Sequence, residues 1–310
     1  MSKAALIIVF NHRYDKNIPI LEKMYSGRFR DIWFLVPFYD GDHPRVIPVY
    51  ESSNYFQSYF AQGFHRFYNE ANSNYIFLGD DCILHPSINQ SNAADLMGLP
   101  PQTDFIPGLI EFHKLGNDNW WHTFKGIDFF RNRKGAEIKN ELPSREEAVQ
   151  LFRNHGIDTL PLTRKNIFGR TSLSKKGFLH WMRSRYHFNY QWKPFLKKGK
   201  LELPYPVAGA YSDILVITAE TIRPFCRYCG IMAAAGLFVE IAIPTALLLS
   251  AKKIAQEPAL RLKGKALWTA AEIAAVETTY GKSLANLLSH FPEGQLYYHP
   301  VKLSRWNNDL

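Results

Sequence analysis

Cysteine is scarce in this sequence, whose 310 residues include only 3, at positions 82, 226 and 229. So few thiols give no disulfide framework, and they fit a reducing compartment best. Cys226 and Cys229 have the C-x-x-C spacing of many zinc sites, but no pair of histidines lies nearby to complete one. We therefore expect both to be ordinary buried thiols.

Long uncharged apolar runs are also missing. The run Ala4–Phe10 is shorter than most signal-peptide cores and no small-residue cleavage site follows it, so we interpret it as a buried strand. The run Ile231–Ala251 is long enough to cross a bilayer, but Glu240 lies at its midpoint and Pro244 follows. We expect this run to form a buried helix-loop-helix, and we expect the protein to be cytoplasmic.

Acidic residues are absent from Arg164–Lys200, which holds 11 Lys or Arg and 8 aromatic residues. This segment accounts for the formal charge of +9, because the remainder of the chain is slightly acidic. One interpretation is a surface that lies on anionic lipid at the inner face of a membrane. A second is a solvated basic loop whose aromatic side chains pack into the core. A third, which we favour least, is binding of nucleic acid.

Strand-like and helix-like segments alternate over the first hundred residues. Continuous apolar runs are typical of parallel strands covered on both faces, and apolar residues at helical spacing indicate the helices between them. This alternation predicts an α/β nucleotide-binding sheet, with ligands at the carboxyl ends of its strands. The expected strands are Ala5–Phe10, Ile32–Phe38, Val46–Tyr50 and Tyr75–Leu78, and the expected helices are Ile18–Tyr25 and Phe56–Tyr68.

Regular structure is expected in shorter pieces over the rest of the chain. Ser144 and Glu147 have the spacing of a capping box at the start of a helix that Gly156 can end. No internal repeat and no low-complexity linker is present. The other expected elements are the strands Ser212–Thr218 and Leu296–His299 and the helices Ala266–Tyr280 and Ser283–Ser289.

Two adjacent carboxylates, Asp80 and Asp81, follow the apolar strand Tyr75–Leu78 directly. Such a pair at the tip of a buried strand repels itself and is poorly solvated, so a positive group is expected beside it. A hard divalent cation that bridges carboxylate and diphosphate oxygens fits this requirement. The alternative is an Asp-Asp turn that caps the segment beginning at Ile83.

The stretch YIFLGDDCILHP resembles the DxD-type motif of GT-A glycosyltransferases. This resemblance implies that Asp81 holds Mn²⁺ or Mg²⁺ and that Asp80 contacts the ribose or the sugar of a nucleotide-sugar donor. Near the other end of the chain, Tyr298–Lys302 is similar to the segment whose histidine completes the metal shell in many of these enzymes. His299 would then be a metal ligand and Lys302 would neutralise the diphosphate. The alternative for His299 is a surface His-Pro turn.

A single carboxylate, Glu240, lies inside the apolar stretch GLFVEIAIPTALL. Burial of a lone carboxylate is costly unless it has a partner or faces a cleft. Its position in the chain is comparable to that of the general base of inverting GT-A enzymes, so we expect Glu240 to deprotonate an acceptor hydroxyl. The alternative is a structural carboxylate paired with Arg223 or Arg227.

Further candidates lie in loops after expected strands. Asn11, His12 and Asp40 are placed to contact the nucleoside of a donor, although all three suit ordinary loops equally well. Glu111, with Trp120 and Trp121, combines a carboxylate with aromatic faces, which is a common way to hold the sugar of an acceptor. The two tryptophans suit a core equally well.

Together these patterns predict one domain over 1–310, with a GT-A-like, Rossmann-type nucleotide-binding sheet and an elaborated acceptor half. Residues 1–115 would bind the donor, with a UDP-sugar favoured, and residues 116–310 would bind a glycan or lipid-linked acceptor. The resemblance implies a transferase of bacterial capsule or lipopolysaccharide synthesis. The reaction inverts the anomeric configuration if Glu240 is the base, and a retaining mechanism stays open if Glu240 is structural. Two alternatives stay open: a nucleotidyltransferase that uses the same paired acids, and a non-catalytic RNA- or membrane-binding protein that acts through 164–200.

Overall fold

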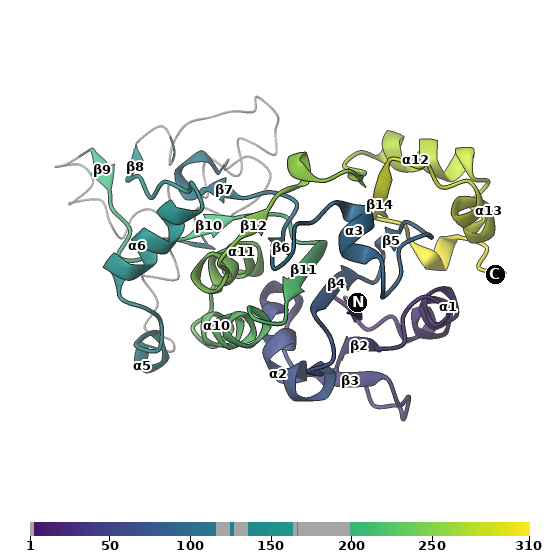
Figure 1. Cartoon of the computed structure of the whole chain (residues 1–310), viewed down its shortest axis with the longest axis horizontal. Coiled ribbons are helices and arrows are strands. Elements are labelled where there is room, and N and C mark those ends of the chain that lie inside the picture. Colours follow the sequence, from purple (N-terminus) through teal and green to yellow (C-terminus); the bar gives the residue numbers. More distant parts are fainter. Residues whose placement is uncertain (1–2, 116–124, 127–135, 164–165, 167–198) are drawn as a thin grey trace. The chain divides into compact units, whose positions relative to one another are not determined.

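The computed structural model describes residues 3–115, 125–126, 136–163, 166 and 199–310 (Figure 1). The chain divides into two compact units that interleave in sequence. The first comprises Met1–Pro107, Ser212–Arg223 and Ala251–Leu310, and the second comprises Gly108–Tyr211 and Pro224–Ser250. The predicted division at residue 115 separates a donor-binding half from an acceptor-binding half. Because it is defined by what each half binds, it stays a prediction.

The first unit is built on a seven-stranded sheet in the order β12-β6-β11-β4-β1-β2-β3. The strands β4, β1, β2 and β3 are parallel, whereas β11 runs antiparallel between β4 and β6. The expected α/β class with a mostly parallel sheet is therefore confirmed. The strands are β1 (Ala4–Val9), β2 (Ile32–Pro37), β3 (Val46–Val49), β4 (Asn74–Gly79), β6 (Asp104–Phe105), β11 (Ile214–Thr218) and β12 (Ile254–Ala255).

Burial explains why the apolar runs form the centre of this sheet. Every residue of β1 is buried, as expected of a strand covered on both faces. The helix α1 (Ile18–Tyr25) contacts β2, and α2 (Gln57–Phe67) contacts β1, β2 and β3. These strands and helices agree with the sequence-based expectations to within one or two residues.

A smaller three-stranded sheet in the same unit has the order β13-β14-β5. β14 (Gln295–His299) pairs antiparallel with β5 (Ile83–Leu84) and parallel with β13 (Lys263–Ala266). The helix expected from Ala266 starts later, because residues 263–266 form β13 and Thr269 caps the helix. The helices of this unit also include α3 (Ala93–Met97), α12 (Ala270–Thr279) and α13 (Leu284–Ser289).

The second unit carries two short antiparallel pairings, β7 (Ile110–Glu111) with β10 (Ala208–Gly209) and β8 (Leu162–Thr163) with β9 (Lys200–Leu201). Its helices are α5 (Ala136–Lys139), α6 (Arg145–Asn154), α11 (Val239–Ser250) and most of α10 (Ile222–Ala234).

The expected helix-loop-helix over 231–251 is confirmed by the break between α10 and α11. Gly236 lies in that break with a left-handed backbone, φ 80°. No helix among the described residues has the length and apolar character needed to cross a bilayer. Cys226 and Cys229 are free and buried on α10, as expected of ordinary thiols.

A buried carboxylate ties β11 to its neighbours in the large sheet. Asp104 is 1% exposed and accepts hydrogen bonds from Thr218 N at 2.7 Å and from Thr221 Oγ1 at 2.8 Å. Burial raises the pKa of Asp104 to about 6 despite these donors. Two buried donors therefore depend on this one side chain.

We expect Asp104→Ala to lower the free energy of unfolding by about 2–4 kcal/mol, because it leaves two buried donors without an acceptor. Asp104→Asn is the matched control and should lose less, since an amide oxygen can still accept from Thr218 N. Urea-induced unfolding of the three proteins measures the difference. Equal stability of the alanine variant and the wild type would contradict this role.

Candidate functional site

The connectivity of the large sheet marks one place for a ligand. From β1 the chain moves outward to β2 and β3, and it then returns to β4 on the other side of β1. Ligands of open α/β sheets bind outside the carboxyl ends of the strands at such a switch point. A pocket with about 430 Å³ of open space lies there, which is within the range of small-molecule sites.

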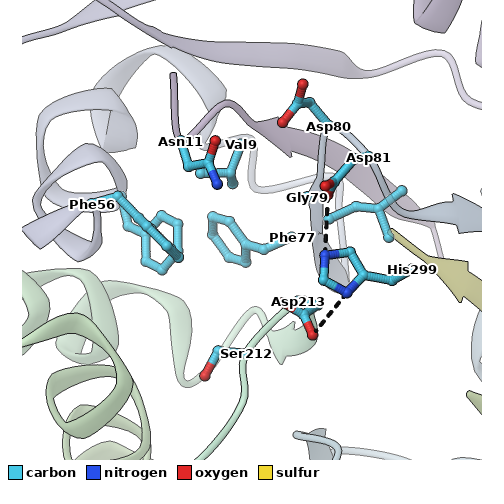
Figure 2. Close-up of a pocket in the computed structure, with 12 residues that line it drawn as sticks. Val9, Asn11, Phe56, Phe77, Gly79, Asp80, Asp81, Ser212, Asp213 and His299 are labelled. Atoms are coloured by element: carbon cyan, nitrogen blue, oxygen red, sulfur yellow. Dashed lines mark ion pairs between the residues drawn. The ribbon is translucent and has the colours of Figure 1, made fainter. Parts of the chain in front are cut away.

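Three polar side chains form a chain of contacts in this pocket. Asp81 Oδ1 lies 3.1 Å from His299 Nε2, and His299 Nδ1 lies 3.3 Å from Asp213 Oδ2 (Figure 2). All three side chains are partly exposed, by 21–32%. The structure thus brings together Asp81 and His299, which the sequence analysis singled out from distant parts of the chain.

The position of Asp81 is set by a tight turn at the end of β4. Cys82 N donates to Gly79 O at 3.0 Å, and Asp80 N donates to Val9 O at 3.1 Å. The turn proposed as the alternative for Asp80 and Asp81 is therefore present, and it holds the Asp81 side chain toward His299 (Figure 2).

The position of His299 follows from strand pairing. His299 is the last residue of β14, and its neighbour Tyr298 pairs with Ile83, two residues after Asp81. Val301 N also donates to Asp81 O at 2.7 Å. β14 and the residues just after it are therefore joined to Asp81 and to β5, which follows Asp81.

Asp213, which the sequence analysis missed, lies immediately before β11. Because β11 is antiparallel to β4, its first residue lies beside the carboxyl end of β4, and Gly79 N donates to Asp213 O at 2.9 Å. The expected strand Ser212–Thr218 already included Asp213. The direction of that strand was the missing information.

Asp80 differs from Asp81 in its surroundings. It is 4% exposed and accepts a hydrogen bond from Asn17 Nδ2 at 3.1 Å, and its carboxylate points away from His299 (Figure 2). Burial, and then the charge of Asp81, raise the pKa of Asp80 to about 7. The two carboxylates therefore have different environments, one enclosed and one facing the pocket.

The electrostatics of His299 favour its charged form. Burial alone lowers the pKa of His299, but the hydrogen bond with Asp81 and the charges of Asp213, Asp81 and Asp80 outweigh it, so the pKa is raised. A cation is thus stabilised at this point of the pocket. The same surroundings would stabilise a bound metal ion in place of the proton.

The donor set fits a divalent cation in part. Two ligand atoms at right angles around an ion, each about 2.1 Å from it, lie about 3.0 Å apart. The 3.1 Å between Asp81 Oδ1 and His299 Nε2 matches this spacing. Asp213 then stands where a carboxylate fixes the second ring nitrogen of a metal-binding histidine.

Protein side chains alone do not complete a metal shell here. Within the described residues, no group of three or more His, Cys, Asp or Glu is arranged to hold an ion. An ion bound by Asp81 and His299 would therefore take its other ligands from water or a substrate. Mg²⁺ is commonly held in this way, by one or two carboxylates together with substrate phosphates.

The other residues expected to bind the donor are dispersed. Asn11 lines the pocket (Figure 2). His12 is exposed, with its ring 5.9 Å from that of Tyr14, and Lys302 is exposed before a short 3-10 helix. Asp40 is exposed and pairs with Arg13, which lowers the pKa of Asp40.

The residues expected on the acceptor side belong to the second unit. Glu111 ends β7 and pairs with His113 at 3.2 Å and Lys114 at 2.6 Å. Glu240 lies in the first turn of α11, and its carbonyl accepts from Ala210 N at 3.0 Å. Their roles stay predictions. Trp120, Trp121 and all of 164–200 except 166 and 199–200 lie outside the described residues.

Two exposed aromatic side chains that the sequence analysis did not single out follow the carboxyl ends of β2 and β3. Phe38 is 57% exposed and Tyr50 is 63% exposed, with ring centroids 6.0 Å apart. Phe38 also has a left-handed backbone, φ 53°, which is strained for a bulky residue. Strain and exposure together at this edge of the sheet are features of binding sites.

We expect Asp80→Asn to flatten the pH dependence of stability. The pKa of Asp80 is raised from 3.8 to about 7, so between these values the native state binds a proton that the unfolded chain has released. The wild type therefore loses stability as pH rises through this window, by up to about 1.4 kcal/mol per unit of pKa difference.

Asparagine has no proton to lose, so the variant should gain stability relative to the wild type from pH 5 to pH 8. Urea-induced unfolding at both pH values, with EDTA present, measures this gain. A stability difference between the two proteins that is the same at pH 5 and pH 8 would contradict the raised pKa of Asp80.

Comparison with known proteins adds no family to this description. No protein-family model matches the chain, and no curated protein matches it either. The function of the pocket therefore has to be inferred from its own geometry and chemistry.

Proposed function

We propose that this chain is a metal-dependent glycosyltransferase that takes a sugar from a nucleotide-sugar donor. The observation that supports this most is the Asp81–His299 pair, with Asp213 behind it, in the pocket at the switch point of the sheet. This pair supplies two ligand atoms for a cation and leaves the remaining ligand positions to a substrate. A diphosphate has the oxygens to fill them.

Each residue of the trio has a distinct role in this proposal. Asp81 and His299 Nε2 would hold the cation, and Asp213 would accept a hydrogen bond from Nδ1–H of His299, which keeps the proton on Nδ1 and leaves Nε2 free to act as a ligand. Mn²⁺ or Mg²⁺ held there would stabilise the negative charge that develops on a departing nucleoside diphosphate. Asp80, enclosed and bonded to Asn17, is placed to orient the turn or to contact the donor.

The transfer exchanges one bond at the anomeric carbon of the donor sugar. The bond to the diphosphate oxygen breaks as a bond to an acceptor hydroxyl oxygen forms, and the hydroxyl proton passes to a base. Glu240 is the proposed base, and direct displacement with this base inverts the anomeric configuration. The acceptor is a glycan or a lipid-linked saccharide, and a UDP-sugar is the favoured donor.

The carboxyl edge of the sheet offers a place for the nucleoside. Asn11 lines the pocket beside β1, and Phe38 and Tyr50 extend the same edge beyond β2 and β3. Adjacent strands lie about 4.8 Å apart, so the ends of β2 and β3 lie roughly 10–14 Å from that of β4. A ribose and two phosphates span about this distance, so the exposed rings are within reach of a base.

The first test is thermal stabilisation by nucleoside diphosphates, with and without Mn²⁺. Because the described part of the chain holds no group of three or more His, Cys, Asp or Glu that could bind an ion, we expect Mn²⁺ and one diphosphate to stabilise the protein together and much less separately. At a hundred times the dissociation constant, the gain should be about 2.7 kcal/mol. Asp81→Ala and His299→Ala should abolish it, and Asp309→Ala, an exposed acid near the C-terminus, should keep it.

Asp213→Asn separates a positioning role from direct ligation. If Asp213 orients His299 without touching the ion, its replacement should lower Mn²⁺ affinity by about 10–100-fold without abolishing binding. Electron paramagnetic resonance of Mn²⁺ with saturating diphosphate measures this affinity without any turnover. If no nucleotide stabilises the wild type, the proposal fails. If only nucleoside triphosphates stabilise the wild type, the site is better explained as that of a nucleotidyltransferase.

Phe38→Gly tests whether the aromatic pair contributes to nucleotide binding. Glycine adopts a left-handed backbone without strain, and the lost side chain is more than half exposed. The variant should therefore stay within about 1 kcal/mol of the wild type in stability. It should bind a nucleoside diphosphate about tenfold more weakly if the ring stacks on the base. Unchanged affinity in isothermal titration would remove Phe38 from the site.

A further inference from the structure

The second unit contains a pocket of its own. It has about 530 Å³ of open space, which is within the range of small-molecule sites, and its described lining residues all belong to that unit. Most of them come from two segments, 158–161 and 202–207, and the helix α6 adds Arg145 and Val149. The described lining includes neither Glu111 nor Glu240, so this pocket is distinct from the residues expected to bind the acceptor.

The two segments that line the pocket are joined by a strand pair. Residues 158–161 lead directly into β8, and residues 202–207 directly follow β9. Because β8 and β9 are antiparallel, with Leu162 opposite Leu201, the end of one segment lies beside the start of the other. Both leucines are buried. Main-chain pairing therefore holds the two sides of the pocket together.

The local sequence restricts the backbone of each segment. Gly156, with φ 72°, follows α6 in the left-handed conformation that is typical of helix C-termini, and this sets the direction in which the chain leaves the helix. Tyr205 lies between Pro204 and Pro206. Each proline fixes its own φ, and the residue before a proline is held in an extended conformation. The pocket is therefore lined by a main chain with little freedom.

The hydroxyl of Tyr205 is buried and lacks a hydrogen-bond partner among the described residues. Burial, and then the nearby Tyr228 and Glu147, raise the pKa of Tyr205, so the hydroxyl keeps its proton. A buried hydroxyl without a partner is costly to the folded chain. Because Tyr205 lines the pocket, a bound molecule with hydroxyl groups can supply the partner that the protein does not.

Charged side chains of both signs also line the pocket. Arg145, Asp158 and Glu202 are exposed there. Two carboxylates beside one guanidinium disfavour an anion, and the guanidinium disfavours an organic cation. A metal ion is not supported either, because no group of three or more His, Cys, Asp or Glu in the described part of the chain could hold one. The charges therefore favour a neutral ligand that both donates and accepts hydrogen bonds.

The remaining lining is apolar. It includes Leu160, which is 57% exposed, together with the buried Phe112 and Val207. An acyl chain would use this surface but would leave the polar lining groups without partners. A pyranose meets both requirements, because its C–H groups contact apolar side chains while its hydroxyls donate to carboxylates and accept from a guanidinium.

We propose that this pocket binds a neutral saccharide ring. Hydroxyls of the ring donate to Asp158 and Glu202, and they accept from Arg145. A further hydroxyl satisfies Tyr205. The proposal does not rest on the transferase function, because no residue of the pocket that holds Asp81 takes part in it.

The first experiment applies the protein to an array of immobilised neutral oligosaccharides, without metal ion or nucleotide, and then titrates one retained oligosaccharide by calorimetry. We expect Asp158→Asn and Glu202→Gln each to bind it about tenfold more weakly, because each loses a charge-assisted hydrogen bond. Glu146→Gln is the matched control and should bind like the wild type, since Glu146 is an exposed acid of α6 outside the lining. Retention of charged oligosaccharides alone, or of none, would overturn the proposal.

Tyr205→Phe separates a ligand-binding hydroxyl from a structural one. The variant should bind the oligosaccharide about five- to tenfold more weakly, because it lacks the hydroxyl. Its urea-unfolding midpoint should equal or exceed that of the wild type, because the change removes a buried hydroxyl that has no described partner. A lower midpoint with unchanged oligosaccharide binding would show that the hydroxyl serves the fold and would contradict its role in binding.

Asp81→Ala keeps this inference distinct from the proposed function. It should bind the oligosaccharide like the wild type, because Asp81 belongs to the first unit and to the other pocket. Loss of binding in Asp81→Ala would place the saccharide in the donor pocket and overturn the assignment. If the wild type binds oligosaccharides but is not stabilised by Mn²⁺ with any diphosphate, the transferase proposal fails and the saccharide site stands.

Discussion

The pairing of β14 with β5 is the constraint on which the candidate site depends. β5 begins two residues after Asp81, so any strand that pairs with it is brought to the turn at the end of β4. β14 ends in His299, and Val301 closes the contact by donating to the carbonyl of Asp81. A histidine 218 positions away in sequence thereby reaches a carboxylate at 3.1 Å.

Charge imbalance is the second constraint. Three carboxylates, Asp80, Asp81 and Asp213, line the pocket, and His299 is the one basic side chain among its described lining residues. The imbalance raises the pKa of His299 and contributes, after burial, to the raised pKa of Asp80. Each of these shifts means that the site holds protons that a free side chain would release. A divalent cation would displace them and satisfy the same carboxylates.

Much of the first unit could be predicted from local pattern. β1, α1 and α2 come from continuous apolar runs and helical spacing, which depend on neighbouring residues alone. Asp81 and His299 could be selected because both follow strand-like runs. Their proximity could not be derived from periodicity, since it depends on which strand pairs with β5. The family resemblance suggested it, and the register of β14 places it.

Other parts of the fold left no local signal. Asp213 reaches the pocket because β11 runs against its neighbour β4, and strand direction is a property of the assembled sheet. The start of α12 was expected at Ala266, because the alanine-rich sequence favours a helix there, but pairing with β14 draws residues 263–266 into β13. The strands of the second unit are two residues long, too short for any periodicity to mark them.

The turn at the end of β4 supplies Asp81 and the strand β14 supplies His299, and this affects how the site forms. The Asp81 turn is local, since Gly79 and Cys82 close it within four residues. His299 is added only when β14 docks on β5, so the two halves of the proposed metal pair come together in the folded first unit alone. A cation that binds both halves therefore favours the docked strand over the undocked one. Among the described residues no third His, Cys, Asp or Glu joins Asp81 and His299 in a metal-binding group, so much of that preference would be expressed when a diphosphate is also present. Docking of β14 would then be linked to occupation of the donor pocket.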